Sequence, residues 1–123
     1  MEYEDITERI INCAIEVHKV LGPGLLENVY KECLYYKLCK EGLIVEKEKS
    51  LPIIFEEVNL DCGYRMDLLV EEKIVIELKS IKKIEDIHIA QILTYMKLGH
   101  YKVGLILNFN VSTLKDGIKR VVN

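Results

Sequence analysis

Three charged side chains interrupt two otherwise apolar stretches of the chain. Residues 66–80 read MDLLVEEKIVIELKS, so Asp67 lies near the start of one apolar run, and Glu77 and Lys79 lie inside the next. Side chains alternate between the two faces of a strand, which places Glu77 and Lys79 on one face and their apolar neighbours on the other. The apolar face suits a core, so the charged face either serves another purpose or is exposed to solvent.

The spacing of these residues predicts a hairpin that brings the two carboxylates together. We expect strands at 64–70 and 74–79, joined by a three-residue loop, in a register that places Asp67 opposite Glu77. Directly opposed residues of an antiparallel pair have Cβ atoms about 5 Å apart. A slip of one residue would place Asp67 opposite Ile76 and bury a carboxylate against apolar side chains. The hydrophobic pattern and the charge cluster therefore favour the same register.

Two adjacent carboxylates beside an ammonium group are suited to the hydrolysis of a phosphodiester. Carboxylates this close raise the pKa of one of them by repulsion, and a divalent cation between them removes that cost. Mg²⁺ binds one or two carboxylates together with waters and substrate phosphates, and it lowers the pKa of a bound water. Lys79 would stabilise charge on the phosphate or orient the attacking water. A cross-strand salt bridge on a solvated face explains the same residues, and the pattern alone leaves both interpretations open.

The elements that must position these residues follow from hydrophobic periodicity and from glycine and proline positions. We expect helices at 5–21, 26–41 and 84–98, and strands at 43–48, 51–58, 64–70, 74–79 and 102–109. Asp5 and Glu8 have the spacing of a capping box, and Gly42 is placed to end the second helix. The segment 111–123 is left open between a short helix, an edge strand and a turn.

This order predicts an α/β fold, α+β by a stricter definition, in one domain covering residues 1–123. An antiparallel meander of three or four strands followed by a helical crossover, in the order α-α-β-β-β-α-β when the meander has three strands, implies a mixed β-sheet flanked by helices. The strand at 102–109 is expected to run parallel to one of its neighbours.

Composition excludes several classes of protein. No apolar run approaches the roughly 20 residues needed to span a membrane, and the acidic start MEYEDITERI lacks the apolar core of a signal peptide. We therefore expect a cytoplasmic protein with no membrane partner, whose four cysteines are reduced core residues. The net charge of −3 argues against a tight, non-specific nucleic-acid binder. It still allows a local rim of lysines around an acidic site, for which the candidates are Lys31, Lys79, Lys82, Lys83 and Lys97.

The residues resemble a known family. Asp67 followed by Glu77-Leu78-Lys79 resembles the PD-(D/E)xK nuclease superfamily, and the run 24–30, GLLENVY, matches the GxxExxY signature of one branch of it. Gln91 and Tyr95 resemble the QxxxY element of RecB-like nucleases. The similarity covers nearly the whole chain, and its motifs together are more specific than any one of them. Met66 stands where the superfamily's name has proline.

This resemblance implies a restriction-endonuclease-like core and a set of roles. Asp67, Glu77 and Glu27 would be ligands of Mg²⁺ or Mn²⁺, with Glu27 approaching from the second helix. Lys79 would be the catalytic lysine, and Gln91 and Tyr95 would complete the site from the helix after the catalytic strand. The implied substrate is nucleic acid, and DNA is expected over RNA. A homodimer is one arrangement that could bind around a duplex.

Two other functions remain open on the sequence. The chain could be a catalytically silent module that binds nucleic acid or protein on a nuclease-like fold, because fold does not imply function. It could also be a structural protein whose charges form a salt-bridge network. The intact set of Asp67, Glu77 and Lys79 favours the nuclease, because an acidic cluster is costly to keep without a use for it.

Overall fold

The computed structural model describes residues 1–123, which form three α-helices, one short 3-10 helix and seven strands. The elements are α1 (Tyr3–Leu21), α2 (Glu27–Lys40), β1 (Val45–Ser50), β2 (Ile53–Phe55), β3 (Val58–Leu60), β4 (Arg65–Val70), β5 (Ile74–Lys79), α3 (Asp86–Gly99), β6 (Val103–Asn108), η1 (Leu114–Gly117) and β7 (Ile118–Val122). None of the helices is long and apolar enough to cross a membrane.

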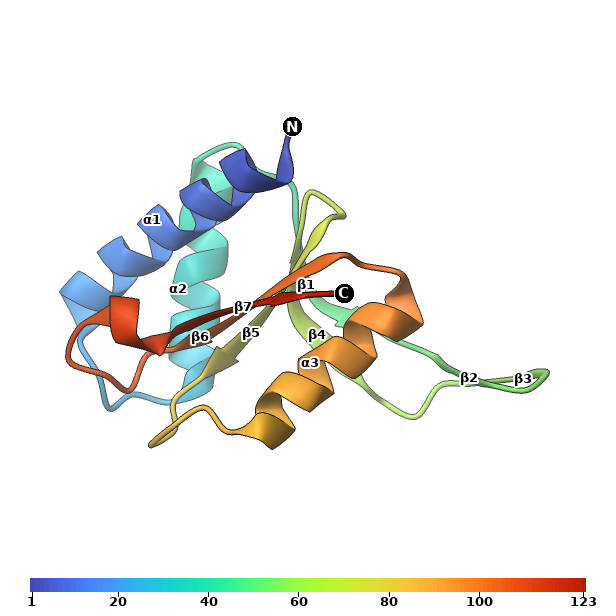
Figure 1. Cartoon of the computed structure of the whole chain (residues 1–123). Coiled ribbons are helices and arrows are strands. Elements are labelled where there is room, and N and C mark those ends of the chain that lie inside the picture. The colour runs from blue at the N-terminus through green and yellow to red at the C-terminus, as the bar shows by residue number, and fades with distance from the viewer.

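Five of the strands form a mixed sheet in the order β1-β4-β5-β6-β7. β5 and β6 are parallel, and every other neighbouring pair is antiparallel. α1 and α2 cover one face of the sheet, and α3 covers the other (Figure 1). The predicted α+β class with a mixed, helix-flanked sheet is confirmed, and so is the parallel placement of the strand expected at 102–109.

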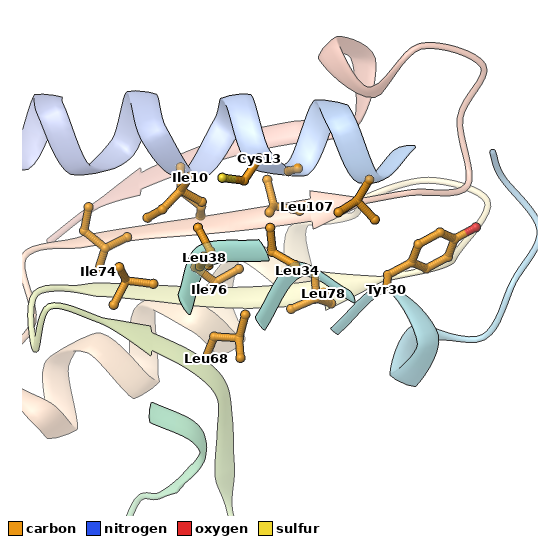
Figure 2. Close-up of a cluster of buried hydrophobic side chains, with 14 of the residues drawn as sticks. Ile10, Cys13, Tyr30, Leu34, Leu38, Leu68, Ile74, Ile76, Leu78 and Leu107 are labelled. Atoms are coloured by element: carbon orange, nitrogen blue, oxygen red, sulfur yellow. The ribbon is translucent and has the colours of Figure 1, made fainter. Parts of the chain in front are cut away.

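The hydrophobic core is divided by the sheet into two layers. The larger layer packs α1 and α2 against Ile74, Ile76 and Leu78, whose side chains all leave β5 on the same face (Figure 2). The smaller layer, which includes Val75, packs the opposite face of the sheet against α3. The alternation predicted for β5 is therefore observed, and it leaves Glu77 on the α3 face of the central strand.

The end of α2 is formed as the sequence predicts. Gly42 has a φ of 85°, in the left-handed region that favours glycine. Its N–H donates to the carbonyl of Cys39, and the N–H of Leu43 donates to the carbonyl of Leu38. These two bonds form a Schellman motif, which satisfies carbonyls that the helix itself leaves free.

The capping box expected at Asp5 and Glu8 is wrong. α1 begins two residues earlier, at Tyr3, and Glu2 precedes it in an extended conformation without a side-chain cap. Tyr3 packs against the core and Ile6 is fully buried within it. Packing of this first turn therefore sets the start of the helix, ahead of the local capping preference.

The single strand expected at 51–58 is also wrong. The chain reverses at Glu56, which has a φ of 56°, and β2 and β3 form a separate two-stranded hairpin that projects from the body (Figure 1). The open segment 111–123 forms η1 and then β7, which pairs with β6 at the edge of the main sheet. The order α-α-β-β-β-α-β thus omits this hairpin and the last strand.

Cysteine placement differs from the expected pattern. All four cysteines are free thiols, as expected, but only Cys13 lies in the core, and Cys39 and Cys62 are exposed.

Candidate active site

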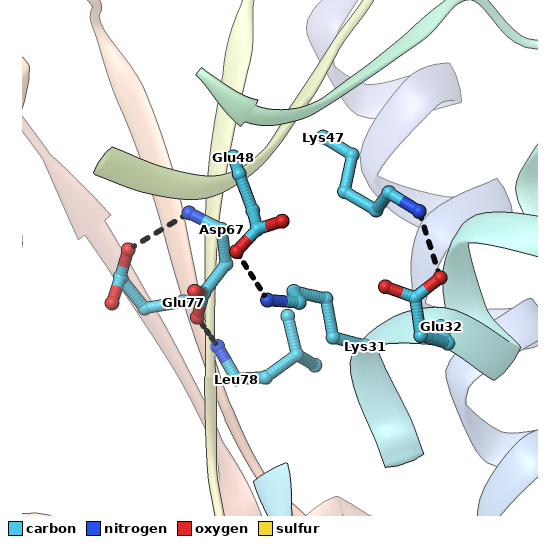
Figure 3. Close-up of polar contacts among 7 residues, drawn as sticks. All are labelled: Lys31, Glu32, Lys47, Glu48, Asp67, Glu77 and Leu78. Carbon is cyan, nitrogen blue, oxygen red and sulfur yellow. Dashed lines mark hydrogen bonds and ion pairs between the residues drawn. The ribbon is translucent and has the colours of Figure 1, made fainter. Parts of the chain in front are cut away.

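Asp67 on β4 and Glu77 on β5 lie side by side, and the side chain of each accepts a hydrogen bond from the backbone of the other's strand. The Asp67 N–H donates to Glu77 Oε1 at 3.3 Å, and the Leu78 N–H donates to Asp67 Oδ2 at 2.9 Å (Figure 3). The β4–β5 ladder runs from Val70 opposite Ile74 to Leu68 opposite Ile76, which is the predicted register. Beyond that point, carboxylate oxygens take the place of ladder carbonyls as acceptors.

The neighbouring strand pair is interrupted at the same place. On the β1–β4 ladder, Lys47 pairs with Leu68 and Lys49 pairs with Met66, but Glu48 and Asp67 do not pair. Glu48 has a φ of 53°, an unusual backbone conformation for a residue other than glycine. Met66 and Leu68 consequently pack in different layers of the core, although two residues apart on a regular strand would share a face. Asp67 therefore sits at a local distortion of β4.

Burial and mutual repulsion make the acid pair hard to ionise fully. Burial is the main cause that raises the pKa of Asp67 above its ordinary value, and the Leu78 N–H opposes it. Burial first, and the charge of Asp67 second, raise the pKa of Glu77 to about 8. The Lys79 ammonium acts on both carboxyls in the opposite direction, which places its charge beside the pair. The site is therefore one to which added positive charge would be attracted.

α2 presents one acid and one base to this pair. The charge of Glu27, the first residue of α2, raises the pKa of both Asp67 and Glu77. Lys31, one helical turn later, is buried and lowers the pKa of Asp67. Its Nζ also lies 3.1 Å from Glu48 Oε1 (Figure 3). The sequence placed Lys31 only among several rim lysines, although its spacing of four from Glu27 is the signal that the two share a helical face.

The position of Glu27 is fixed by the turn before α2. The Tyr30 hydroxyl donates to the Gly22 carbonyl at 2.6 Å and accepts from the Leu25 N–H at 3.1 Å. Ser80 Oγ, just after β5, donates to the Leu25 carbonyl at 2.6 Å. Tyr30 is fully buried. The tyrosine of the GLLENVY motif therefore holds the turn in place and does not face the acid pair.

α3 supplies Tyr95 and Gln91 from the opposite face of the sheet. Tyr95 is largely buried, and burial followed by the charge of Glu77 raises the pKa of its hydroxyl, while Gln91 opposes this effect. The ring of Tyr64 lies 6.0 Å from that of Tyr95, tilted by 57°. Tyr64 is a neighbour of the site that the sequence did not single out, because it lies just outside any expected motif.

The sequence of the chain matches the model of one family of known proteins. The family model of the PD-(D/E)XK nuclease superfamily matches residues 4–121, which is nearly the whole chain. The chain belongs to the PD-(D/E)XK nuclease superfamily. Membership indicates nuclease activity on a nucleic-acid substrate and agrees with a restriction-endonuclease-like fold. No curated protein and no solved structure matches the chain.

Nucleases of this superfamily generally use divalent metal ions, and the donor set of this chain can be compared with that requirement. No group of three or more His, Cys, Asp and Glu side chains is gathered closely enough to hold a metal ion. Asp67 and Glu77 supply two adjacent carboxylates, and Mg²⁺ commonly takes one or two carboxylates with waters and substrate phosphates as its remaining ligands. The pair therefore fits such an ion, and the role of Glu27 as a further ligand stays a prediction.

Proposed function

We propose that this chain is a metal-dependent nuclease that hydrolyses phosphodiester bonds in DNA. The observation that supports this most strongly is the acid pair itself. Two hydrogen bonds from backbone N–H groups hold Asp67 and Glu77 close together. Burial and the charge of Asp67 raise the pKa of Glu77, and a divalent cation between the two carboxylates would counteract that rise. A pair of carboxyls with one buried and one half-buried member, at a distortion of the central sheet, is costly for a purely structural role.

The residues around the pair suit the steps of the reaction. Asp67 and Glu77 would hold Mg²⁺ or Mn²⁺, which when bound polarises a phosphoryl oxygen and lowers the pKa of a water. Lys79 would orient the attacking water or stabilise negative charge on the phosphate. Glu27 would approach from α2 as a further acidic group, and Tyr95 with Gln91 would position the substrate from α3.

A duplex would need two such sites to be cut on both strands. A single site of this kind hydrolyses one phosphodiester bond at a time, so we propose that a homodimer is the form that acts on double-stranded DNA. Sedimentation velocity of the protein with and without a short duplex checks this, and a monomer under both conditions would limit the proposal to single-strand cleavage.

The test of the proposed function is a cleavage assay with matched variants. Wild-type protein is incubated with plasmid DNA, labelled single-stranded DNA and RNA in Mg²⁺, Mn²⁺ or EDTA. We expect Asp67→Ala and Lys79→Ala to lower the rate by about 10² or more, in line with loss of one group that stabilises developing charge. Asp61→Ala and Lys40→Ala, both exposed positions, should cleave at the wild-type rate.

Circular dichroism must show that all four variants are folded. Retained cleavage by Asp67→Ala and Lys79→Ala would contradict the assignment. Absence of cleavage by the wild type on every substrate and metal would favour the catalytically silent binding module. Cleavage of RNA alone would keep the nuclease and overturn the preference for DNA.

A further inference from the structure

A polar pocket of about 320 Å³ lies beyond the end of β5, where the chain leaves Lys79. Its walls come from the segment after β5, the first turn of α3, the end of β6 and the start of β7. Its charged lining residues are Lys82, Lys83, Lys119 and Asp116. Three ammonium groups and one carboxylate give the pocket an excess of positive charge, within a chain of net charge −3.

We call this pocket the phosphate pocket. None of its three lysines forms an ion pair with an acidic side chain. The ion pairs of the molecule engage other basic side chains, namely Lys31, Lys37, Lys47, Lys49, Arg65 and Arg120. Lys82, Lys83 and Lys119 are exposed and form none. Their charge is therefore available to an anion.

Asn108 fixes both walls of the phosphate pocket. Its side-chain amide donates to the Ile81 carbonyl at 3.0 Å, and its Oδ1 accepts from the Ile81 N–H at 3.1 Å. The Phe109 N–H donates to the Lys79 carbonyl at 2.9 Å. On the other wall, Gly117 lies so close to the Asn108 carbonyl that a side chain there would not fit. Lys82, Lys83 and Lys119 thus extend from backbone that is tied to the end of β6.

The phosphate pocket lies on the same face of the sheet as Glu77. Glu77 is in register with Ile106 on β6, and Ile106 is in register with Lys119 on β7. Residues in register project to the same face, and the next residue, Arg120, reaches Glu4 on α1 at the opposite face. Two strand spacings of about 4.8 Å separate Lys119 from Glu77 along this row. That distance spans at most about three nucleotides of a stacked strand, because each nucleotide rises about 3.4 Å along the axis and the path between backbone phosphates is longer.

We propose that the phosphate pocket binds backbone phosphates of the nucleic acid a few nucleotides from the bond that is cleaved. This inference rests on the proposed nuclease function, because it takes the position of the acid pair as the cleavage site. Lysine contacts to phosphates position a strand without reading its sequence. The pocket would therefore raise affinity for any strand, and it would account for nucleic-acid binding by a chain whose net charge is −3.

The salt dependence of binding tests this proposal separately from cleavage. All proteins carry Asp67→Asn and are kept in EDTA, so that binding is measured without hydrolysis. Binding of a fluorescent duplex and a fluorescent single strand is followed by anisotropy from roughly 50 to 200 mM salt. Lys83→Ala/Lys119→Ala is compared with Lys40→Ala/Lys102→Ala, which removes two exposed, unpaired lysines outside the pocket and keeps the net charge equal.

We expect the pocket variant to bind more weakly, with a slope of log affinity against log salt that is smaller by about 1.8 for duplex and about 1.4 for single strand. The control variant should keep the slope of its parent. Equal slopes in all three proteins, or no binding by the parent, would overturn the proposal. Wild-type cleavage, assayed separately in Mg²⁺, decides the nuclease function: lysine-dependent binding without cleavage would retain the pocket and reject the nuclease.

Discussion

Asp67, which is half-buried, and Glu77, which is buried, are both stabilised by the backbone of the opposite strand. Each carboxylate accepts an N–H that a regular ladder would have paired with a carbonyl. Such bonds favour the charged form of a carboxyl, but burial and the neighbouring carboxyl oppose them and prevail at Glu77, whose pKa rises to about 8. Without a cation, the pair therefore carries a proton near neutral pH.

This raised pKa predicts how the stability of the metal-free protein changes with pH. The folded protein binds a proton at Glu77 that the unfolded chain, with an ordinary pKa of 4.5, has already released. The contribution of Glu77 to the free energy of unfolding should therefore be highest below about pH 4.5. It should decrease as pH rises through about 8, with a slope of up to about 1.4 kcal/mol per pH unit. Urea unfolding in EDTA across this range measures it.

The matched variants for this experiment are Glu77→Gln and Glu57→Gln. Glu77→Gln removes one titrating group and keeps an oxygen to accept the Asp67 N–H, so the unfolding free energy should decrease less steeply with pH than in the wild type. Glu57→Gln changes an exposed carboxyl and should behave as the wild type. Parallel pH profiles in wild type and Glu77→Gln would show that Glu77 is not the group responsible.

At the scale of the elements, the turn before α2 connects the N-terminal helices to the end of β5. The Tyr30 hydroxyl bonds this turn on both sides, and Ser80 ties it to the residue after β5. Glu27 begins α2 immediately after this turn. The distance between Glu27 and the acid pair therefore depends on bonds made by residues that do not themselves reach the pair.

Tyr30→Phe tests this dependence with little change in shape. Removal of the hydroxyl leaves the Leu25 N–H and the Gly22 carbonyl without that partner, so we expect a loss of about 1–3 kcal/mol in unfolding free energy. Cleavage should also decrease, because the turn that carries Glu27 is loosened. Urea unfolding and the cleavage assay measure the two effects.

Tyr36→Phe is the control for this variant, because Tyr36 is exposed and its hydroxyl makes no hydrogen bond. It should retain both stability and activity. A Tyr30→Phe protein that is as stable as Tyr36→Phe would contradict the role assigned to the hydroxyl.

The β4–β5 hairpin was predictable because two independent signals coincide in it. The alternation of apolar residues in IVIELK fixes which face is buried, and the positions of Asp67 and Glu77 fix the register. The β2–β3 hairpin was not predictable, because its reversal uses Glu56 in a left-handed conformation, where a turn signal would normally be glycine or asparagine. β7 was left open because a short edge strand has no clear periodicity of its own.

For the whole molecule, residues that work together come from segments that are far apart in the chain. The phosphate pocket combines Lys83 after β5 with Lys119 on β7, and the charge of Lys31 on α2 lowers the pKa of Asp67 on β4. Hydrophobic pattern and motif identify the individual elements, but only packing around the sheet shows which of many surface lysines face the site. The candidate acids were therefore predictable from sequence, and Lys31, Lys79, Lys82 and Lys83 were among the lysines proposed for the rim. Lys119 was not among them, because it lies on the strand that the sequence left open.

Thermal unfolding of wild type and Asp67→Asn tests most directly whether Asp67 and Glu77 bind a divalent cation. Both proteins are melted in EDTA, MgCl₂ and MnCl₂ at constant ionic strength. An ion at about 100 times its Kd stabilises the folded state by about 2.7 kcal/mol, so the wild-type Tm should rise by several degrees. Asp67→Asn should melt at the same temperature in all three solutions. Identical responses of the two proteins to Mg²⁺ and Mn²⁺ would contradict a metal site at this pair.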